Sequence, residues 1–114
     1  MMRGCSIVIV IAVTAFGCRG KPEPPIRVEG NLITLENQTG RDWSNVEIWL
    51  NDHYRVTKPT LLRGERVQVP LDVFVAGFGQ RFDTRRQTPL GIQVVATAGG
   101  GTPVKLEWGR GGRR

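Results

Sequence analysis

The sequence predicts an all-β domain of six or seven short antiparallel strands behind an apolar N-terminal segment. From Ile26 onward, apolar and polar residues alternate in short runs, which is the pattern of strands with one buried face. Turn sequences rich in glycine and asparagine separate these runs. No stretch has the apolar period of a long helix. These observations indicate a sandwich or a small barrel.

The predicted strands follow one another as alternating runs. The first is expected over residues 27–36, with Ile33 and Leu35 pointing inward and Gly30 marking a bulge. Each later strand also places one apolar set on the inner face. These sets are Val46, Ile48 and Leu50; Val67, Val69 and Leu71; Ile92, Val94, Ala96 and Ala98; and Val104, Leu106 and Trp108.

Turn sequences connect these strands. The turn sequences are 37–40, 51–53 (leading into a strand at 54–56), 64–65 and 99–101. A single helical turn is expected within residues 72–79, with Val73 and Phe74 packed inward. Pro70 and Pro103 lack a backbone N–H donor, so their strands are expected at sheet edges.

An export signal is expected at residues 1–17. Arg3 gives it a positive start, Ile7–Phe16 is an apolar run, and the small Gly17 precedes Cys18. This junction resembles a bacterial lipoprotein signal, in which the cysteine is lipidated and becomes the first residue of the mature chain. The resemblance implies two or three acyl chains on Cys18, which together hold a protein firmly on a membrane.

Two alternatives remain for this segment. The apolar run would be roughly 15 Å long as a helix, against about 30 Å for the hydrocarbon core, which disfavours a transmembrane anchor. The lipoprotein pattern has Leu in place of Ala15 and a smaller residue in place of Phe16, so cleavage without lipidation stays open. Arg19, by resemblance to enteric lipoproteins, favours the outer over the inner membrane of the bacterial cell envelope.

The mature chain divides into three predicted parts. Residues 18–25 form a tether, in which prolines favour an extended polyproline conformation that would hold the domain roughly 20 Å from a membrane. Residues 26–108 form the sandwich, and residues 109–114 form a basic Gly/Arg tail. The only other cysteine, Cys5, lies in the signal, so the domain has no disulfide.

The charge of the chain argues against a nucleic-acid partner. The 16 Lys and Arg exceed the 10 Asp and Glu, for a net charge of +6. One of these cations lies in the signal and three lie in the tail, so the folded part is almost balanced. A nucleic-acid binder would concentrate positive charge on its folded surface.

Within the domain, a set of turn and strand residues resembles the FxLYD-type and related immunoglobulin-like sandwich domains of bacterial envelope proteins. These residues are Asn37-Gln38-Thr39, Trp43, the run 46–51 and the turn Leu62-Arg63-Gly64-Glu65. The likeness covers residues 28–98 and extends to the fold alone, because the Phe-x-Leu-Tyr-Asp run is absent. It implies an immunoglobulin-like antiparallel β-sandwich without shared catalytic residues.

Residues that could perform catalysis are sparse. His53 is the only histidine and lies in a predicted turn, whereas a metal site needs three or four converging ligands. Ser44 is the only serine of the mature chain, so a nucleophilic triad is not expected. The acidic residues show no spacing that favours a glycosidase pair. We therefore expect no enzyme, no metal and no cofactor.

Four residues are candidate contacts for a partner or a glycan. Alternation points Trp49 away from the core, where it would stack a sugar or dock a protein, unless a loop such as the one with Phe78 covers it. Arg81, Arg85 and Arg86 form a basic cluster, either a solvated loop or a contact for anionic lipid or an acidic partner. The other large aromatics are expected in the core; they are Trp43, Phe74, Phe82 and Trp108.

The sequence thus predicts a lipid-anchored, non-catalytic envelope protein that acts as an interaction or accessory module. Its expected partners are the membrane, through lipid on Cys18, and an envelope protein. A carbohydrate-binding domain of the cell envelope is the alternative.

Overall fold

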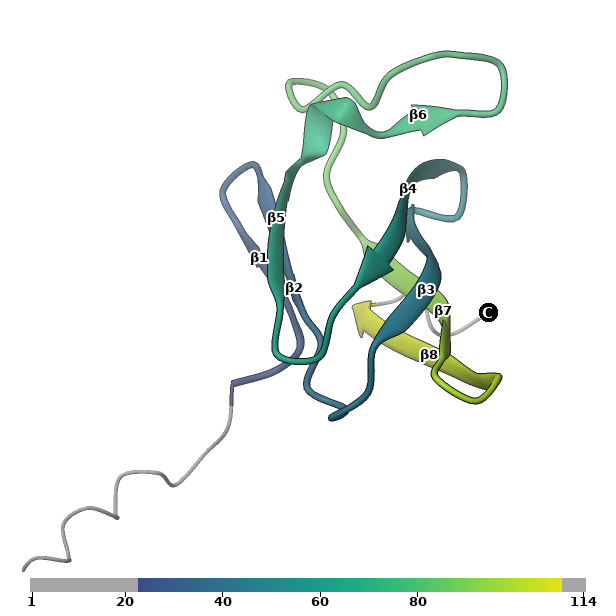
Figure 1. The fold of residues 1–114 in the computed structure, drawn as a ribbon. Coiled ribbons are helices and arrows are strands. Elements are labelled where there is room, and N and C mark those ends of the chain that lie inside the picture. The colour runs from purple at the N-terminus through teal and green to yellow at the C-terminus, as the bar shows by residue number, and fades with distance from the viewer. Residues whose placement is uncertain (1–22, 110–114) are drawn as a thin grey trace, which may run out of the picture.

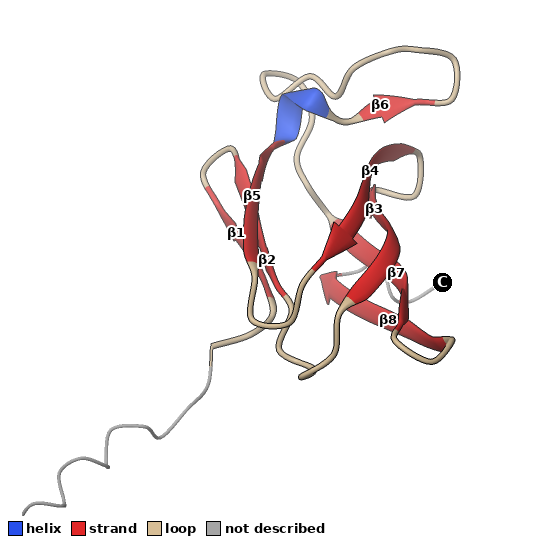
Figure 2. Cartoon of the chain, in the orientation of Figure 1, coloured by secondary structure: helices blue, strands red, loops and turns tan. Residues whose placement is uncertain are grey.

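The computed structural model describes residues 23–109. The predicted signal peptide, Cys18, the first part of the tether and residues 110–114 of the tail lie outside the described residues. The described part consists of strands and one short 3₁₀ helix (Figure 1, Figure 2). The elements are β1 (Ile26–Glu29), β2 (Leu32–Glu36), β3 (Trp43–Leu50), β4 (Tyr54–Leu61), β5 (Arg66–Pro70), η2 (Leu71–Val73), β6 (Val75–Ala76), β7 (Gly91–Ala98) and β8 (Thr102–Gly109).

The strands form two antiparallel sheets that pack as a sandwich. One sheet has the order β1-β2-β5 and the other has the order β6-β4-β3-β7-β8. The chain crosses between the sheets after β2, after β4 and after β5. Two antiparallel sheets that face each other across a common core form a β-sandwich. The predicted all-β sandwich is confirmed.

The strand count exceeds the predicted six or seven for two reasons. Gly30 does not mark a bulge: its φ of 59° places it in a tight turn that divides the predicted strand 27–36 into β1 and β2. The second reason is β6, which adds a short strand to the edge of β4. An isolated glycine signals both a bulge and a turn, because both use positive φ.

The sheet edges agree with the proline positions. Pro70 lies in β5 and Pro103 lies in β8, and each of these strands is the outer strand of its sheet. Pro59 lies in β4 beyond the part that pairs with β6, so it also occupies an edge. At such positions the missing N–H donor costs no ladder hydrogen bond.

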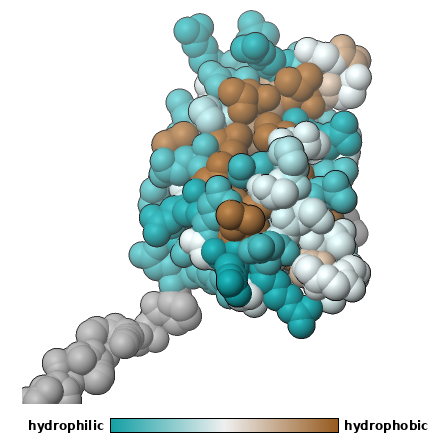
Figure 3. All heavy atoms as spheres, viewed as in Figure 1, coloured by the Kyte–Doolittle hydropathy of each residue, from teal (hydrophilic) through white to brown (hydrophobic). Residues whose placement is uncertain are grey.

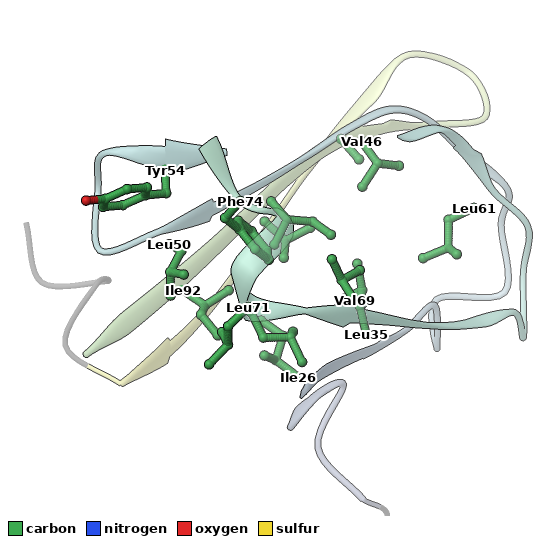
Figure 4. Close-up of a cluster of buried hydrophobic side chains, with 14 of the residues drawn as sticks. Ile26, Leu35, Val46, Leu50, Tyr54, Leu61, Val69, Leu71, Phe74 and Ile92 are labelled. Atoms are coloured by element: carbon green, nitrogen blue, oxygen red, sulfur yellow. The ribbon is translucent and has the colours of Figure 1, made fainter. Parts of the chain in front are cut away.

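The core fills the space between the two sheets (Figure 4). The inward sets predicted for the strands containing Ile33, Ile48 and Ile92 are buried. Val104, Leu106 and Trp108 are only half-buried, because β8 is an edge strand. In the segment after β5, the 3₁₀ helix begins at Leu71; Phe74 is buried as expected, but Val73 is exposed to solvent.

The sandwich has two distinct ends (Figure 1). The chain enters the described part at what we call the leader end, where Glu36 N donates to Pro25 O at 2.9 Å and Gly64 N donates to Asn37 O at 2.8 Å. The opposite, loop end carries the turn at Gly30, the β3–β4 turn and the long connection of residues 71–90. Strands of eight residues such as β3 separate these ends by about 26 Å.

The described part of the predicted tether lies against the leader end. Arg27 Nη1 forms an ion pair with Glu23 Oε1 at 2.7 Å and donates to Pro24 O at 3.3 Å. Gln38 Nε2 donates to Glu23 O at 2.9 Å. These contacts hold residues 23–25 on the domain.

Candidate functional site

The connection of residues 71–90 is anchored to the sandwich by a buried aromatic pair. Phe82 is buried, and its ring meets Tyr54 edge-on with centroids 5.2 Å apart. Phe82 N also donates to Phe74 O at 2.9 Å. Long connections without such anchors are usually mobile. Here the base of the loop is part of the core.

A polar turn extends this anchor to the surface. Gln87 Nε2 donates to the Tyr54 hydroxyl at 3.1 Å, and Gln87 Oε1 accepts from Asp83 N at 3.0 Å. Asp83 Oδ1 accepts from Arg85 N at 2.9 Å, and Arg86 N donates to Asp83 O at 3.1 Å. The turn therefore holds Arg85 and Arg86 next to each other, and both are exposed.

A small hairpin projects from the same end. Val75 bridges Arg81, Ala76 N donates to Gln80 O at 2.8 Å, and Gly79, with φ of 92°, closes the tip. Phe78 lies between two glycines at this tip and is 78% exposed. An aromatic side chain that lacks core contacts in an ordered hairpin is available for binding.

Exposed apolar side chains gather at the loop end. Of the six large hydrophobic residues that are exposed in the described part, only Leu62 lies at the leader end. The others are Leu32, Val73, Val75, Phe78 and Leu90. Figure 3 shows hydrophobic atoms over η2 and β6 with hydrophilic atoms beside them. The loop end thus combines apolar and cationic groups.

Trp49 lies on the outer face of the larger sheet, as predicted. Its ring is half-buried: Nε1 donates to Glu47 Oε1 at 3.1 Å, and the Arg55 guanidinium lies 5.3 Å from the ring centroid. Arg55 lies over the ring, and residues 75–77 of the Phe78 loop line a hollow together with Trp49, whereas Phe78 itself faces solvent.

The strand register connects this tryptophan with the loop. Cross-strand partners share one face of a sheet, and one row of partners crosses all five strands. The row consists of Arg81, Val75, Arg55, Trp49, Gln93 and Glu107. A hollow of about 380 Å³ lies beside it, lined by Trp49, His53, Arg55, Thr57, Val75, Ala76 and Gly77.

The structure places three of the four candidate contacts in one connection and the fourth, Trp49, three cross-strand steps from Arg81. Arg81 shares a row with Trp49, and Arg85 and Arg86 follow in the same connection. Phe78 is the residue that sequence reasoning missed. Its signal was the pair of flanking glycines, which interrupts any alternation that could bury it.

The remaining aromatics lie in the core or against it, and His53 lies in a turn. Trp43, Phe74 and Phe82 are buried in the core, and Trp108 is half-buried against it. His53 is exposed in the β3–β4 turn, where Asn51 and Asp52 have positive φ.

Within residues 23–109, no three His, Cys, Asp or Glu side chains are grouped to hold a metal ion. The same residues include no helix long and apolar enough to cross a membrane.

No family model, curated protein or solved structure matches this chain.

Proposed function

We propose that this chain is a lipid-anchored, non-catalytic binding module of the bacterial cell envelope, with lipid on Cys18 and an envelope protein as partner. The observation that carries the proposal is the construction of the loop end. Phe82 and Gln87 attach the long connection to the core, while Phe78 and Arg85 face solvent. Pre-ordering of exposed side chains lowers the entropy cost of binding, which is a property of interaction surfaces.

The anchoring half of the proposal is supported by the sequence at Cys18 and by the leader. Four residues separate Cys18 from Glu23, where the chain is already held on the sandwich. Lipid on Cys18 would then place the leader end next to the bilayer. The binding half is supported by the opposite, loop end.

Mass spectrometry of the protein purified from its native host tests the anchor. We expect a mature chain that begins at Cys18 and carries two or three acyl chains, and we expect it in the membrane fraction. A Cys18→Ser variant should appear in the soluble fraction with its sandwich intact. An unmodified Cys18 thiol in the native protein would contradict the proposal.

A glycan-binding function is the second candidate, favoured by the hollow beside Trp49. Sugar rings stack on open aromatic faces, and Arg55 would have to move from the Trp49 ring to admit one. This function predicts that peptidoglycan fragments or envelope oligosaccharides quench tryptophan fluorescence, and that Trp49→Ala abolishes the quenching. Absence of quenching across such a panel would remove this candidate.

A further inference from the structure

We propose that the loop end docks an acidic segment of a partner protein, with Phe78 entering an apolar pocket and Arg81 and Arg85 pairing with carboxylates around it. This inference rests on the proposed function, because it names the surface and the partner chemistry of the same module. Three observations support it: the unpaired cations, the exposed apolar group, and the position of both relative to the leader.

The cations at the loop end are available to a partner. Within residues 23–109, no carboxylate lies within salt-bridge distance of Arg81 or Arg85, and both side chains are exposed. Arg86 has only a weak contact with Asp83 at 3.6 Å, and its side chain is 83% exposed. All three cations of this connection are arginines, whose planar guanidinium groups pair with carboxylates through two parallel hydrogen bonds.

The apolar group lies beside these cations. Phe78 projects from the hairpin that is closed by the Val75–Arg81 bridge, and Val75 is itself 36% exposed. Aromatic residues and arginines dominate the binding energy of protein interfaces, where a ring fills a pocket and charges surround it. The hairpin hydrogen bonds and the Phe82 anchor hold this arrangement before any partner arrives.

The position of the loop end favours a protein over the bilayer that holds the lipid. Five chain steps from Cys18 to Glu23 reach at most about 18 Å. Residues 23–25 are held at the leader end, and the strands separate Phe78 from that end by about 26 Å. With lipid on Cys18 and the leader end at the bilayer, the loop end would lie on the far side of the sandwich from the anchoring membrane, facing the proteins of the envelope space.

Site-specific photocrosslinking in the native host tests the inference with the full chain. The variant Phe78→p-benzoylphenylalanine is compared with Leu62→p-benzoylphenylalanine, an exposed apolar position at the leader end, and with Lys105→p-benzoylphenylalanine on the outer sheet face. We expect position 78 to form an adduct with one protein, mapped to a segment rich in Asp and Glu. The paired change Arg81→Glu and Arg85→Glu should lower the adduct yield about tenfold or more, whereas Arg63→Glu at the leader end should leave it unchanged.

Several outcomes would overturn the inference. A phospholipid adduct at position 78 would identify a membrane surface instead. An undiminished adduct after the charge reversals would remove the role of the arginines. Capture of a protein from position 105 but not from position 78 would leave the module proposal standing and move its surface elsewhere. Absence of a protein adduct at all three positions would contradict both proposals.

Discussion

The Asn37 side chain connects two segments at the leader end, and its replacement tests how the fold is held together there. The side chain is fully buried. Its Nδ2 donates to Leu61 O at 2.9 Å and to Arg41 O at 2.7 Å, and its Oδ1 accepts from Thr39 N at 3.0 Å and from Thr39 Oγ1 at 2.8 Å. One carboxamide thus forms hydrogen bonds with both the turn after β2 and the end of β4.

The substitution Asn37→Asp keeps the shape and removes both donated bonds. It places a carboxylate oxygen against the carbonyl oxygens of Leu61 and Arg41. Each lost hydrogen bond costs about 0.5–1.5 kcal/mol net, and a buried acceptor left without a donor costs about 1–3 kcal/mol. We expect the free energy of unfolding to fall by about 3–4 kcal/mol at pH 7. That is a large part of the roughly 5–15 kcal/mol typical of a domain.

The loss of unfolding free energy in the Asn37→Asp variant should increase as the pH rises. Burial and the facing carbonyl oxygens raise the pKa of the carboxyl introduced at position 37, because the neutral acid can donate one hydrogen bond that the carboxylate cannot. A raised pKa in the folded state means that stability is greater below the unfolded-state pKa of about 3.9 and is lost as pH rises toward the folded-state pKa. The gap between wild type and variant should therefore widen from about pH 4 upward.

Urea unfolding followed by tryptophan fluorescence measures this gap at several pH values. The control Asn31→Ala changes an exposed asparagine, and it should alter the free energy of unfolding by no more than about 0.5 kcal/mol. An Asn37→Asp variant as stable as wild type at pH 7, or a gap that does not change with pH, would refute the reasoning.

Three further substitutions test the loop end. Phe82→Ala removes a buried ring and should raise hydrogen exchange across residues 75–90 while β3 and β7 stay protected; an unchanged exchange pattern would show that the ring does not anchor the loop. Gly109→Ala would place a Cβ against the Leu90 carbonyl oxygen at a φ of 71°, and it should cost about 2 kcal/mol or more. Gly30→Ala has an unobstructed Cβ position at a φ of 59° and should cost only about 1 kcal/mol. Urea unfolding measures both costs, and an equal loss of unfolding free energy in Gly109→Ala and Gly30→Ala would contradict this difference.

Most of the fold could be predicted because its signals are local. Alternation predicted which face of each central strand is buried, as at Val46, Ile48 and Leu50. The glycine triplet predicted its hairpin, and Gly100 and Gly101 have the expected positive φ. These features depend on a few neighbouring residues, so one sequence is enough to find them.

The candidate site was harder to predict from the sequence, because its arrangement depends on strand register and on contacts between residues far apart in the chain. Trp49 and Arg81 lie in one row only because β6 pairs with β4 and also bridges residue 81. Phe78 and Phe82 are both loop aromatics in the sequence, yet Phe82 is buried against Tyr54 and Phe78 is exposed. Alternation does not operate in such a loop, so it could not separate the two.

Energy transfer between a single labelled site and fluorescent lipid tests the proposed orientation, in which the leader end lies at the membrane and the loop end lies away from it. A cysteine is introduced by Phe78→Cys or by Leu62→Cys in the full chain, labelled with a donor dye, and measured in native-host membranes containing an acceptor lipid. The proposed orientation predicts strong transfer from position 62, next to the bilayer, and weak transfer from position 78, about 26 Å farther out. Equal transfer from both positions, or a protein that is absent from the membranes, would contradict it.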